Sequence, residues 1–218
     1  RFYVQYGSNN LHHENTVKAI KKNLEGLTKI SKERIIDELF KMMKLNNFNK
    51  LFEDDFCKFI FLSIFPQLRN FNRIKNFNKI INKTKSKVDK ILMLSILLID
   101  DSDSCDYFLY KYKLSNDNKK RILFIKDNLN SSFKKEFFSK NNLLKLIYLF
   151  DKFFVLDLLI FLFFVNTKKI NKIENLIFYI KETDKPKFPI NAKFLKEEFN
   201  LIEGKELGDL LKKIEKKW

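Results

Sequence analysis

The sequence predicts an all-α protein, and three observations support this fold class. Only 4 Gly and 3 Pro occur in 218 residues, and these are the two residue types that interrupt helices most strongly. Apolar residues make up 45% of the chain and recur every three or four positions, which is the period of an amphipathic helix. Serines suited to capping helix N-termini precede two of these segments, at Ser31 and Ser115. These features argue against a turn-rich all-β protein and predict a succession of helices.

The helices are separated by turn residues. Residues 7–10, Gly-Ser-Asn-Asn, mark a turn, Gly26 ends the first long helix as its C′ residue, and Pro66 ends or begins a helix. Gly208 lies inside a helical pattern and costs about 1 kcal/mol relative to Ala, so we expect close backbone packing there. The predicted helices are residues 11–24, 30–45, 48–65, 67–83, 87–99, 107–114, 115–128, 131–140, 142–165 (one bent helix or two), 169–181, 192–199 and 204–217, with a proline-containing linker at 183–189.

The formal net charge of +16 indicates a polyanionic partner, with nucleic acid first and an anionic membrane surface second. Lys, Asn, Ile and Phe are all over-used, as in products of AT-rich genes, so codon bias contributes to this charge. The candidate RNA contacts are the basic residues outside the apolar stripes of two predicted helices: Arg69, Arg73, Lys75, Lys79, Lys119, Lys120 and Arg121.

One segment resembles a membrane-spanning helix in composition and another resembles a metal-binding loop, but neither fits that role. The run LLIFLFFV at the end of 143–165 is too short to span a bilayer and follows charged residues, so it predicts a core helix. Residues 100–106, DDSDSCD, lack the Gly and Glu of a calcium loop and predict a solvated loop between helices.

The histidines and cysteines do not form a recognisable metal motif. His12, His13 and Glu14 are neighbours that point in different directions on a helix, and no third ligand is spaced to join them. Cys57 and Cys105 are isolated, which indicates unpaired thiols in a reducing compartment. The sequence therefore predicts no metal site.

The segment ISKERIIDELFKMM at 30–43 has the clearest local pattern. Ser31 predicts an N-cap, and the apolar residues that follow it form a broad stripe. Arg34, Glu38 and Lys41 share one polar face at spacings of four and three residues. The pattern by itself predicts a capped amphipathic helix with a solvated polar face.

This segment resembles the I-S-x-E-R-x-x-x-E-x-x-K neck helix of bacterial CCA-adding tRNA nucleotidyltransferases and their poly(A) polymerase relatives. Arg1-Phe2 resembles the end of that family's E-D-x-x-R-x-x-R-A-x-R-F segment, and residues 188–218 resemble its C-terminal tail. The resemblance implies an all-α array of neck (1–47), body (48–130) and tail (131–218), detached from an N-terminal catalytic head.

The resemblance also implies a function. The parent enzyme would be a cytoplasmic, non-membrane nucleotidyltransferase that adds nucleotides from CTP and ATP to the tRNA 3′ end, with Mg²⁺ bound in the head. This chain would be a fragment, inactive alone, whose partners are tRNA and its own catalytic head domain. Arg1, Glu33, Arg34, Glu38 and Lys41 would support the nucleotide-selecting segment. Two alternatives remain: a poly(A) polymerase of the same family, and a non-catalytic basic helical module that binds RNA or acts as a scaffold.

Overall fold

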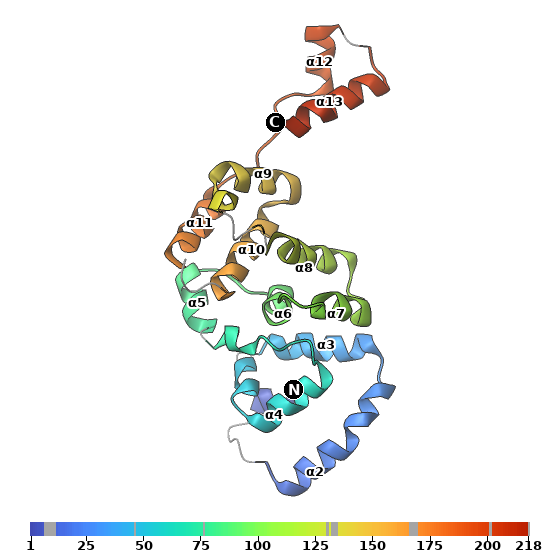
Figure 1. Ribbon diagram of the computed structural model, residues 1–218, viewed down its shortest axis with the longest axis vertical. Helices are drawn as coiled ribbons and strands as arrows, with labels where there is room; N and C mark the ends of the chain where they lie inside the picture. Colours follow the sequence, from blue (N-terminus) through green and yellow to red (C-terminus); the bar gives the residue numbers. More distant parts are fainter. Residues whose placement is uncertain are drawn as a thin grey trace.

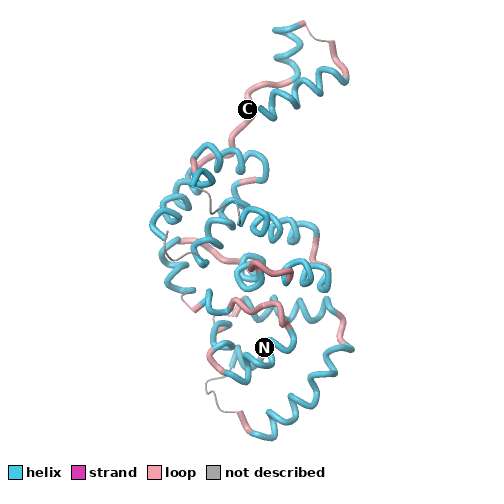
Figure 2. Tube along the Cα trace, viewed as in Figure 1, coloured by secondary structure: helices cyan, strands magenta, loops and turns pink. Residues whose placement is uncertain are grey.

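The computed structural model of the chain is an elongated stack of short helices (Figure 1). It describes residues 1–6, 12–45, 47–75, 77–129, 131, 135–165, 170–200 and 202–217, apart from the side chains of residues 79 and 170. This part of the chain contains thirteen α-helices and no strand (Figure 2), which confirms the all-α prediction.

The N-terminal part forms short helices around α3 and α4. They are α1 (Phe2–Tyr6), α2 (Glu14–Asn23), the 3-10 helix η1 (Leu24–Lys29), α3 (Lys32–Met43), the 3-10 helix η2 (Phe48–Phe52) and α4 (Asp55–Ile64). The Ser31 hydroxyl accepts a hydrogen bond from Arg34 N–H at 3.3 Å, which confirms the predicted N-cap. The predicted helix 48–65 is wrong in its continuity, because the Asp54 side chain begins α4 by accepting a hydrogen bond from Cys57 N–H. Gly26 lies inside η1 without a positive φ, so its predicted role as a C′ residue is wrong as well.

The central part consists of the 3-10 helix η3 (Phe71–Ile74), α5 (Phe77–Thr84), α6 (Lys90–Leu98), α7 (Ser104–Tyr112) and α8 (Asn116–Leu129). The single helix predicted at 67–83 is therefore two shorter elements. The acidic segment that begins at Asp100 connects α6 to α7, as expected for an interhelical loop. Asp100 accepts hydrogen bonds there from Ser102 N–H and from Asn70 Nδ2, which fold the loop back on itself and onto η3.

The C-terminal part comprises the 3-10 helix η5 (Lys135–Phe138), α9 (Lys140–Phe150), α10 (Lys152–Val165), α11 (Ile170–Glu182), α12 (Ala192–Phe199) and α13 (Lys205–Lys217). Asp151, with a φ of 102°, separates α9 from α10, so the segment 142–165 is two helices. α10 packs against α6, α8, α9 and α11, which confirms that its apolar run forms a core helix. No helix in the described ranges combines the length and apolar content needed to cross a bilayer.

α6 lies at the centre of the stack (Figure 1). Every residue from Ile91 to Leu98 is buried, and α3, α8, α10 and η3 all pack against this helix. A helix without a polar face can be stable only when neighbours cover it on all sides. Its free backbone groups at both ends then need partners, because water reaches them poorly.

Polar side chains from the neighbouring elements satisfy both ends of α6. At the N-terminus, Asp89 accepts hydrogen bonds from Ile91 N–H at 3.1 Å and Leu92 N–H at 2.9 Å. At the C-terminus, the Arg73 guanidinium donates to the carbonyl oxygens of Ile96 at 2.9 Å and Ile99 at 2.6 Å. Asn70 Nδ2 donates to the carbonyl oxygen of Leu97 at 3.1 Å. These contacts provide partners for backbone groups at both ends of a helix whose residues from Ile91 to Leu98 are all buried.

Arg121 connects α6, α8 and α10 through two carboxylates. Its guanidinium lies 2.7 Å from Asp89 Oδ2, next to the start of α6, and 2.7 Å from Asp157 Oδ2, within α10. Burial raises the pKa of Asp157 to about 6 even though Arg121 opposes this shift. The charge of Arg121 therefore offsets the cost of placing a carboxylate inside the core.

One buried apolar cluster extends from Val4 to Ile180. It crosses both boundaries of the predicted division into neck, body and tail, and that division stays a prediction.

α12 and α13 form a separate helical pair at one end of the molecule (Figure 1), with Leu195 and Leu207 buried in it. A hydrogen bond from the Tyr148 hydroxyl to Glu215 connects this pair to α9. A Cβ atom at Gly208 would meet open space, so the expected close backbone packing there is wrong.

Replacing Arg121 with Ala should lower the free energy of unfolding by about 3–5 kcal/mol, because it leaves a buried carboxylate without its partner. Lys120→Ala is the matched control: this neighbouring side chain is exposed, and its loss should change stability by less than about 0.5 kcal/mol. Chemical denaturation measures both values.

The Arg121→Ala deficit should also depend on pH. The pKa of Asp157 is raised on folding, so its contribution to stability is present at low pH and is lost as pH rises through about 6. Without Arg121, the deficit should be larger at pH 8 than at pH 5. A deficit that does not change with pH would contradict this account of Asp157.

Gly208→Ala should stabilise α13 by about 1 kcal/mol, because Ala is the better helix former and the site has room. The matched control is Gly204→Ala. Gly204 precedes α13, and its carbonyl oxygen accepts a hydrogen bond from Gly208 N–H. Gly is favoured over Ala at such a position, so this change should not stabilise α13. Amide hydrogen exchange within α13 reports both effects, and a loss of protection in Gly208→Ala would show an unrecognised contact.

Candidate functional site

Four of the five residues predicted to support the nucleotide-selecting segment line one hollow. Arg1, Arg34, Glu38 and Lys41 surround a cavity of about 440 Å³. Its apolar wall comes from η1 and from the end of α4. Glu33 does not line this cavity and is exposed on the first turn of α3. The spacing along α3 explains this division, because Arg34, Glu38 and Lys41 share a face that Glu33 does not.

Glu38 orders the charges of this hollow. Its carboxylate accepts hydrogen bonds from Lys41 Nζ at 2.8 Å and forms an ion pair with Arg1 at 3.0 Å. The hydrogen bond from Lys41 lowers the pKa of Glu38, and the charge of Arg1 lowers it further. Arg34 is exposed at the edge of the same hollow and forms no ion pair with any described residue. The arrangement holds two cations in fixed positions and leaves a third available.

A second, smaller hollow of about 140 Å³ adjoins the first and shares Leu27, Ile35 and Ile64 as lining residues. Two further cations, Lys32 of α3 and Lys111 of α7, line it. Burial lowers the pKa of Lys111, and the charge of Lys32 lowers it further. Neither lysine has an acidic partner within the described ranges. Two like charges held together without a counter-ion create a positive potential that favours an anion such as phosphate.

We call the group Arg1, Lys32, Arg34, Lys41 and Lys111 the α3 surface. Sequence reasoning missed Lys32 and Lys111. Lys32 stands at a variable position of the recognised motif, and Lys111 is brought next to it only because α7 packs against α3. No local signal in the sequence could have paired them.

Exposed aromatic rings lie beside several of the basic groups. The Arg1 guanidinium lies 5.7 Å from the ring of Phe2, which is 70% exposed. Lys21 Nζ lies 5.6 Å from the ring of Phe59, which is 49% exposed. A ring beside a cation can stack on an unpaired base while the cation contacts its phosphate.

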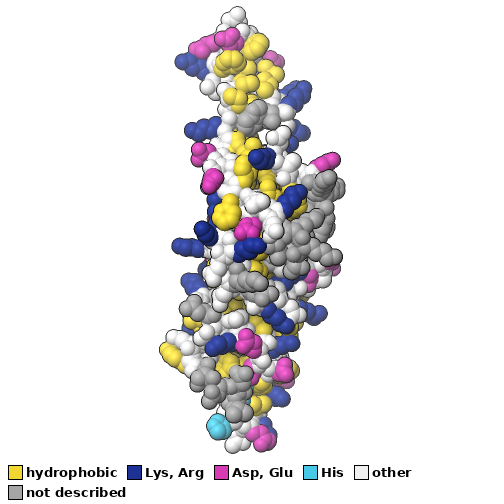
Figure 3. Space-filling view, turned by 90° about the vertical axis from the view of Figure 1, so that its left-hand side faces the viewer, with side chains coloured by type: hydrophobic (Ala, Val, Ile, Leu, Met, Phe, Trp, Pro, Cys, Tyr) yellow, Lys and Arg dark blue, Asp and Glu magenta, His cyan; other side chains and the backbone are white. Residues whose placement is uncertain are grey.

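The other predicted RNA contacts divide into two groups. Arg73 and Arg121 are engaged within the fold: Arg73 donates to carbonyl oxygens at the C-terminus of α6, and Arg121 pairs with Asp89 and Asp157. Arg69, Lys75 and Lys120 are exposed and Lys119 is half-buried, whereas the side chain of Lys79 lies outside what the structure describes. Basic side chains on the face shown in Figure 3 are spread along its length.

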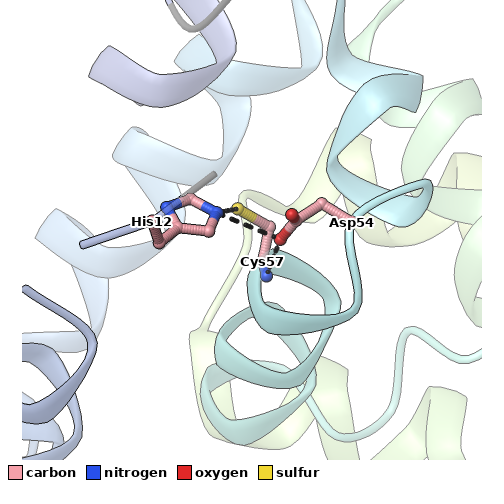
Figure 4. Close-up of side chains that lie close together, drawn as sticks. All are labelled: His12, Asp54 and Cys57. Atoms are coloured by element: carbon pink, nitrogen blue, oxygen red, sulfur yellow. Dashed lines mark hydrogen bonds and ion pairs between the residues drawn. The ribbon is translucent and has the colours of Figure 1, made fainter. Parts of the chain in front are cut away.

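Three potential metal ligands meet at the start of α4 (Figure 4). His12 Nε2 lies 3.3 Å from Asp54 Oδ1 and 3.7 Å from Cys57 Sγ. Burial and the neighbouring Asp54 raise the pKa of the Cys57 thiol to about 12. His13 and Glu14, which adjoin His12 in sequence, are exposed and do not join this group.

Part of this region matches a known family model. Residues 13–71 match the family model for the probable RNA- and SrmB-binding site of polymerase A. The matched segment contains α2, α3, α4 and most of the α3 surface. The match supports a relation to the poly(A)/CCA polymerase family and an RNA-binding role for this part of the chain. A search of curated proteins gave no match.

The pKa of Glu38 should rise toward its ordinary value in Lys41→Met, because the hydrogen bond from Lys41 is the main cause of its lowering. Lys44→Met is the control, since the exposed Lys44 is absent from the groups that shift this pKa. The lowered pKa of Glu38 means that its ionised carboxylate stabilises the fold. Wild type should therefore lose this contribution to stability as pH falls through the pKa of Glu38 in the folded protein. NMR titration of the side-chain carboxyl carbon measures the value, and an unchanged pKa in Lys41→Met would contradict this geometry.

Proposed function

We propose that this chain is the RNA-binding helical part of a CCA-adding tRNA nucleotidyltransferase. The observation that carries the proposal is the overlap between the RNA-binding family model at residues 13–71 and the α3 surface. Arg1, which precedes α1, and lysines and an arginine from α3 and α7 gather there, beside two adjoining hollows, and this charge suits the phosphate backbone of RNA.

The α3 surface has two roles in this proposal. Arg1, Arg34, Glu38 and Lys41 support the nucleotide-selecting segment of a catalytic head, with Glu33 on the neighbouring face of α3. Lys32 and Lys111 bind RNA phosphate groups. Recognition by shape and phosphate suits a duplex stem, whose deep major groove hides the edges of its bases. CTP and ATP are the substrates in this proposal. The catalytic head is the partner domain of this chain and binds Mg²⁺, and the enzyme acts in the cytoplasm.

The second candidate is a poly(A) polymerase of the same family, which the matched family description favours because it names polymerase A. The two candidates predict different RNA preferences. A CCA-adding enzyme grips the folded stems of tRNA, whereas a poly(A) polymerase must hold a growing single strand of adenylates.

The chain should bind tRNA lacking its 3′ CCA end more tightly than oligoadenylate, with an affinity that falls steeply as salt concentration rises. Replacing both Lys32 and Lys111 with Met should weaken binding and reduce the slope of log affinity against log salt by about 1 for each lysine. The reason is that fewer counterions are released on binding when a phosphate contact is lost. Fluorescence anisotropy over a series of salt concentrations measures both quantities.

The matched control is Lys216→Met with Lys217→Met, which removes the same charge at the exposed end of α13, far from α3 (Figure 1). An equal loss in the control would show that RNA responds to total charge and would overturn the placement on the α3 surface. Preference for oligoadenylate over tRNA would support the poly(A) candidate instead. Binding that does not depend on salt would contradict both.

A further inference from the structure

We propose that His12, Asp54 and Cys57 form a binding site for a divalent zinc-type ion that ties the segment before α2 to the start of α4. The imidazole Nε2, one carboxylate oxygen and the thiol sulfur all face one another (Figure 4) and lie within 4.8 Å of one another. This site is independent of RNA binding, so the failure of either proposal leaves the other standing.

The separations between the donor atoms fit tetrahedral coordination. Zinc lies about 2.0–2.2 Å from nitrogen or oxygen and about 2.3 Å from sulfur, so two tetrahedral ligands stand about 3.3–3.6 Å apart. His12 Nε2 is 3.3 Å from Asp54 Oδ1 and 3.7 Å from Cys57 Sγ. Small side-chain adjustments would therefore complete the geometry, and the fourth position would be open to water.

The surrounding structure holds each ligand in place. Asp54 Oδ1 accepts a hydrogen bond from Cys57 N–H at 2.6 Å, which fixes the carboxylate against the first turn of α4. The His12 ring lies between Tyr3 and Phe56, with both ring centroids at 5.1 Å. Ligands that are already oriented lose little freedom when they bind a metal.

The charge balance of the site also favours a cation. Asp54 and Asp157 are buried carboxylates, and Asp157 has Arg121 beside it. Asp54 forms no ion pair with a Lys or Arg among the described residues, and its neighbours are an imidazole and a thiol. A bound divalent ion would compensate the buried carboxylate and would also stabilise the thiolate, whose proton leaves to solvent on binding.

The kinds of ligand select the ion. Sulfur and imidazole nitrogen favour zinc over magnesium and calcium, which bind oxygen ligands. The His12 side chain is 16% exposed, so an ion can reach the site from one side. Such an ion would fix the beginning of α2 relative to α4, at one end of the family-model match.

The test uses the full 218-residue chain after removal of metal by a chelator. Zinc should then bind at one ion per chain, and cobalt(II) as a spectroscopic substitute should give the thiolate-to-metal charge-transfer band of a cysteine ligand. Cys57→Ala should abolish that band. Cys105→Ala is the matched control at the only other cysteine, in α7, and should keep the band.

The histidines offer a second matched pair. His12→Ala should lower zinc affinity at least about 100-fold. Loss of a residue that only hydrogen-bonds to a metal ligand already lowers affinity about 10- to 100-fold, and His12 is a ligand itself. His13→Ala removes the other histidine, which is exposed, and should leave affinity unchanged. Competition with a chromogenic chelator measures these affinities.

Asp54→Asn separates a metal ligand from a structural cap. Asn also caps helices, so α4 should remain folded by circular dichroism, while zinc affinity should fall at least about 10-fold. The proposal is overturned if wild type gives no thiolate–cobalt band, if the band survives in Cys57→Ala, or if folded Asp54→Asn and His12→Ala bind zinc as wild type does.

Discussion

The structure depends on the complete burial of α6. A helix with no polar face must be covered on every side, and the elements that cover it come from both halves of the chain: α3 and η3 on one side, α8 and α10 on the other. Its ends impose a stricter condition, because buried backbone donors and acceptors need partners. Asp89, whose carboxylate binds Arg121, supplies them at the N-terminus, and Arg73 with Asn70 supplies them at the C-terminus. α6 therefore links the region around α3 to the helices that follow it.

This constraint explains why basic residues of similar appearance have different roles. Arg73 and Arg121 carry planar guanidinium groups whose several donors suit carbonyl and carboxylate oxygens inside the fold. Lys32 and Lys111 line a hollow, and neither has an acidic partner in the described part of the chain. Overall positive charge indicates a polyanionic partner, but the burial and partners of each cation determine which of them are available to it.

The α3 surface joins elements that are distant in sequence. Glu38 forms ion pairs with Arg1, the residue before α1, and with Lys41 from its own helix, and Lys111 comes from α7. The same is true of the cluster at the start of α4, where His12 meets Asp54 and Cys57. In both places an N-terminal residue completes a group whose other members lie on later helices or at the start of one, so both depend on how the first residues pack.

The sequence by itself determined the fold class, most helix positions and the α3 motif, because these depend on local periodicity, capping and residue spacing. It placed Ser31 as a cap and Arg34, Glu38 and Lys41 on one face, since helical geometry fixes those relations within a few residues. Only the tertiary structure decided which cations are exposed, which breaks divide the longer apolar segments, and that His12 meets Cys57. These features depend on contacts between residues far apart in the chain, and local physical preferences carry no information about such contacts.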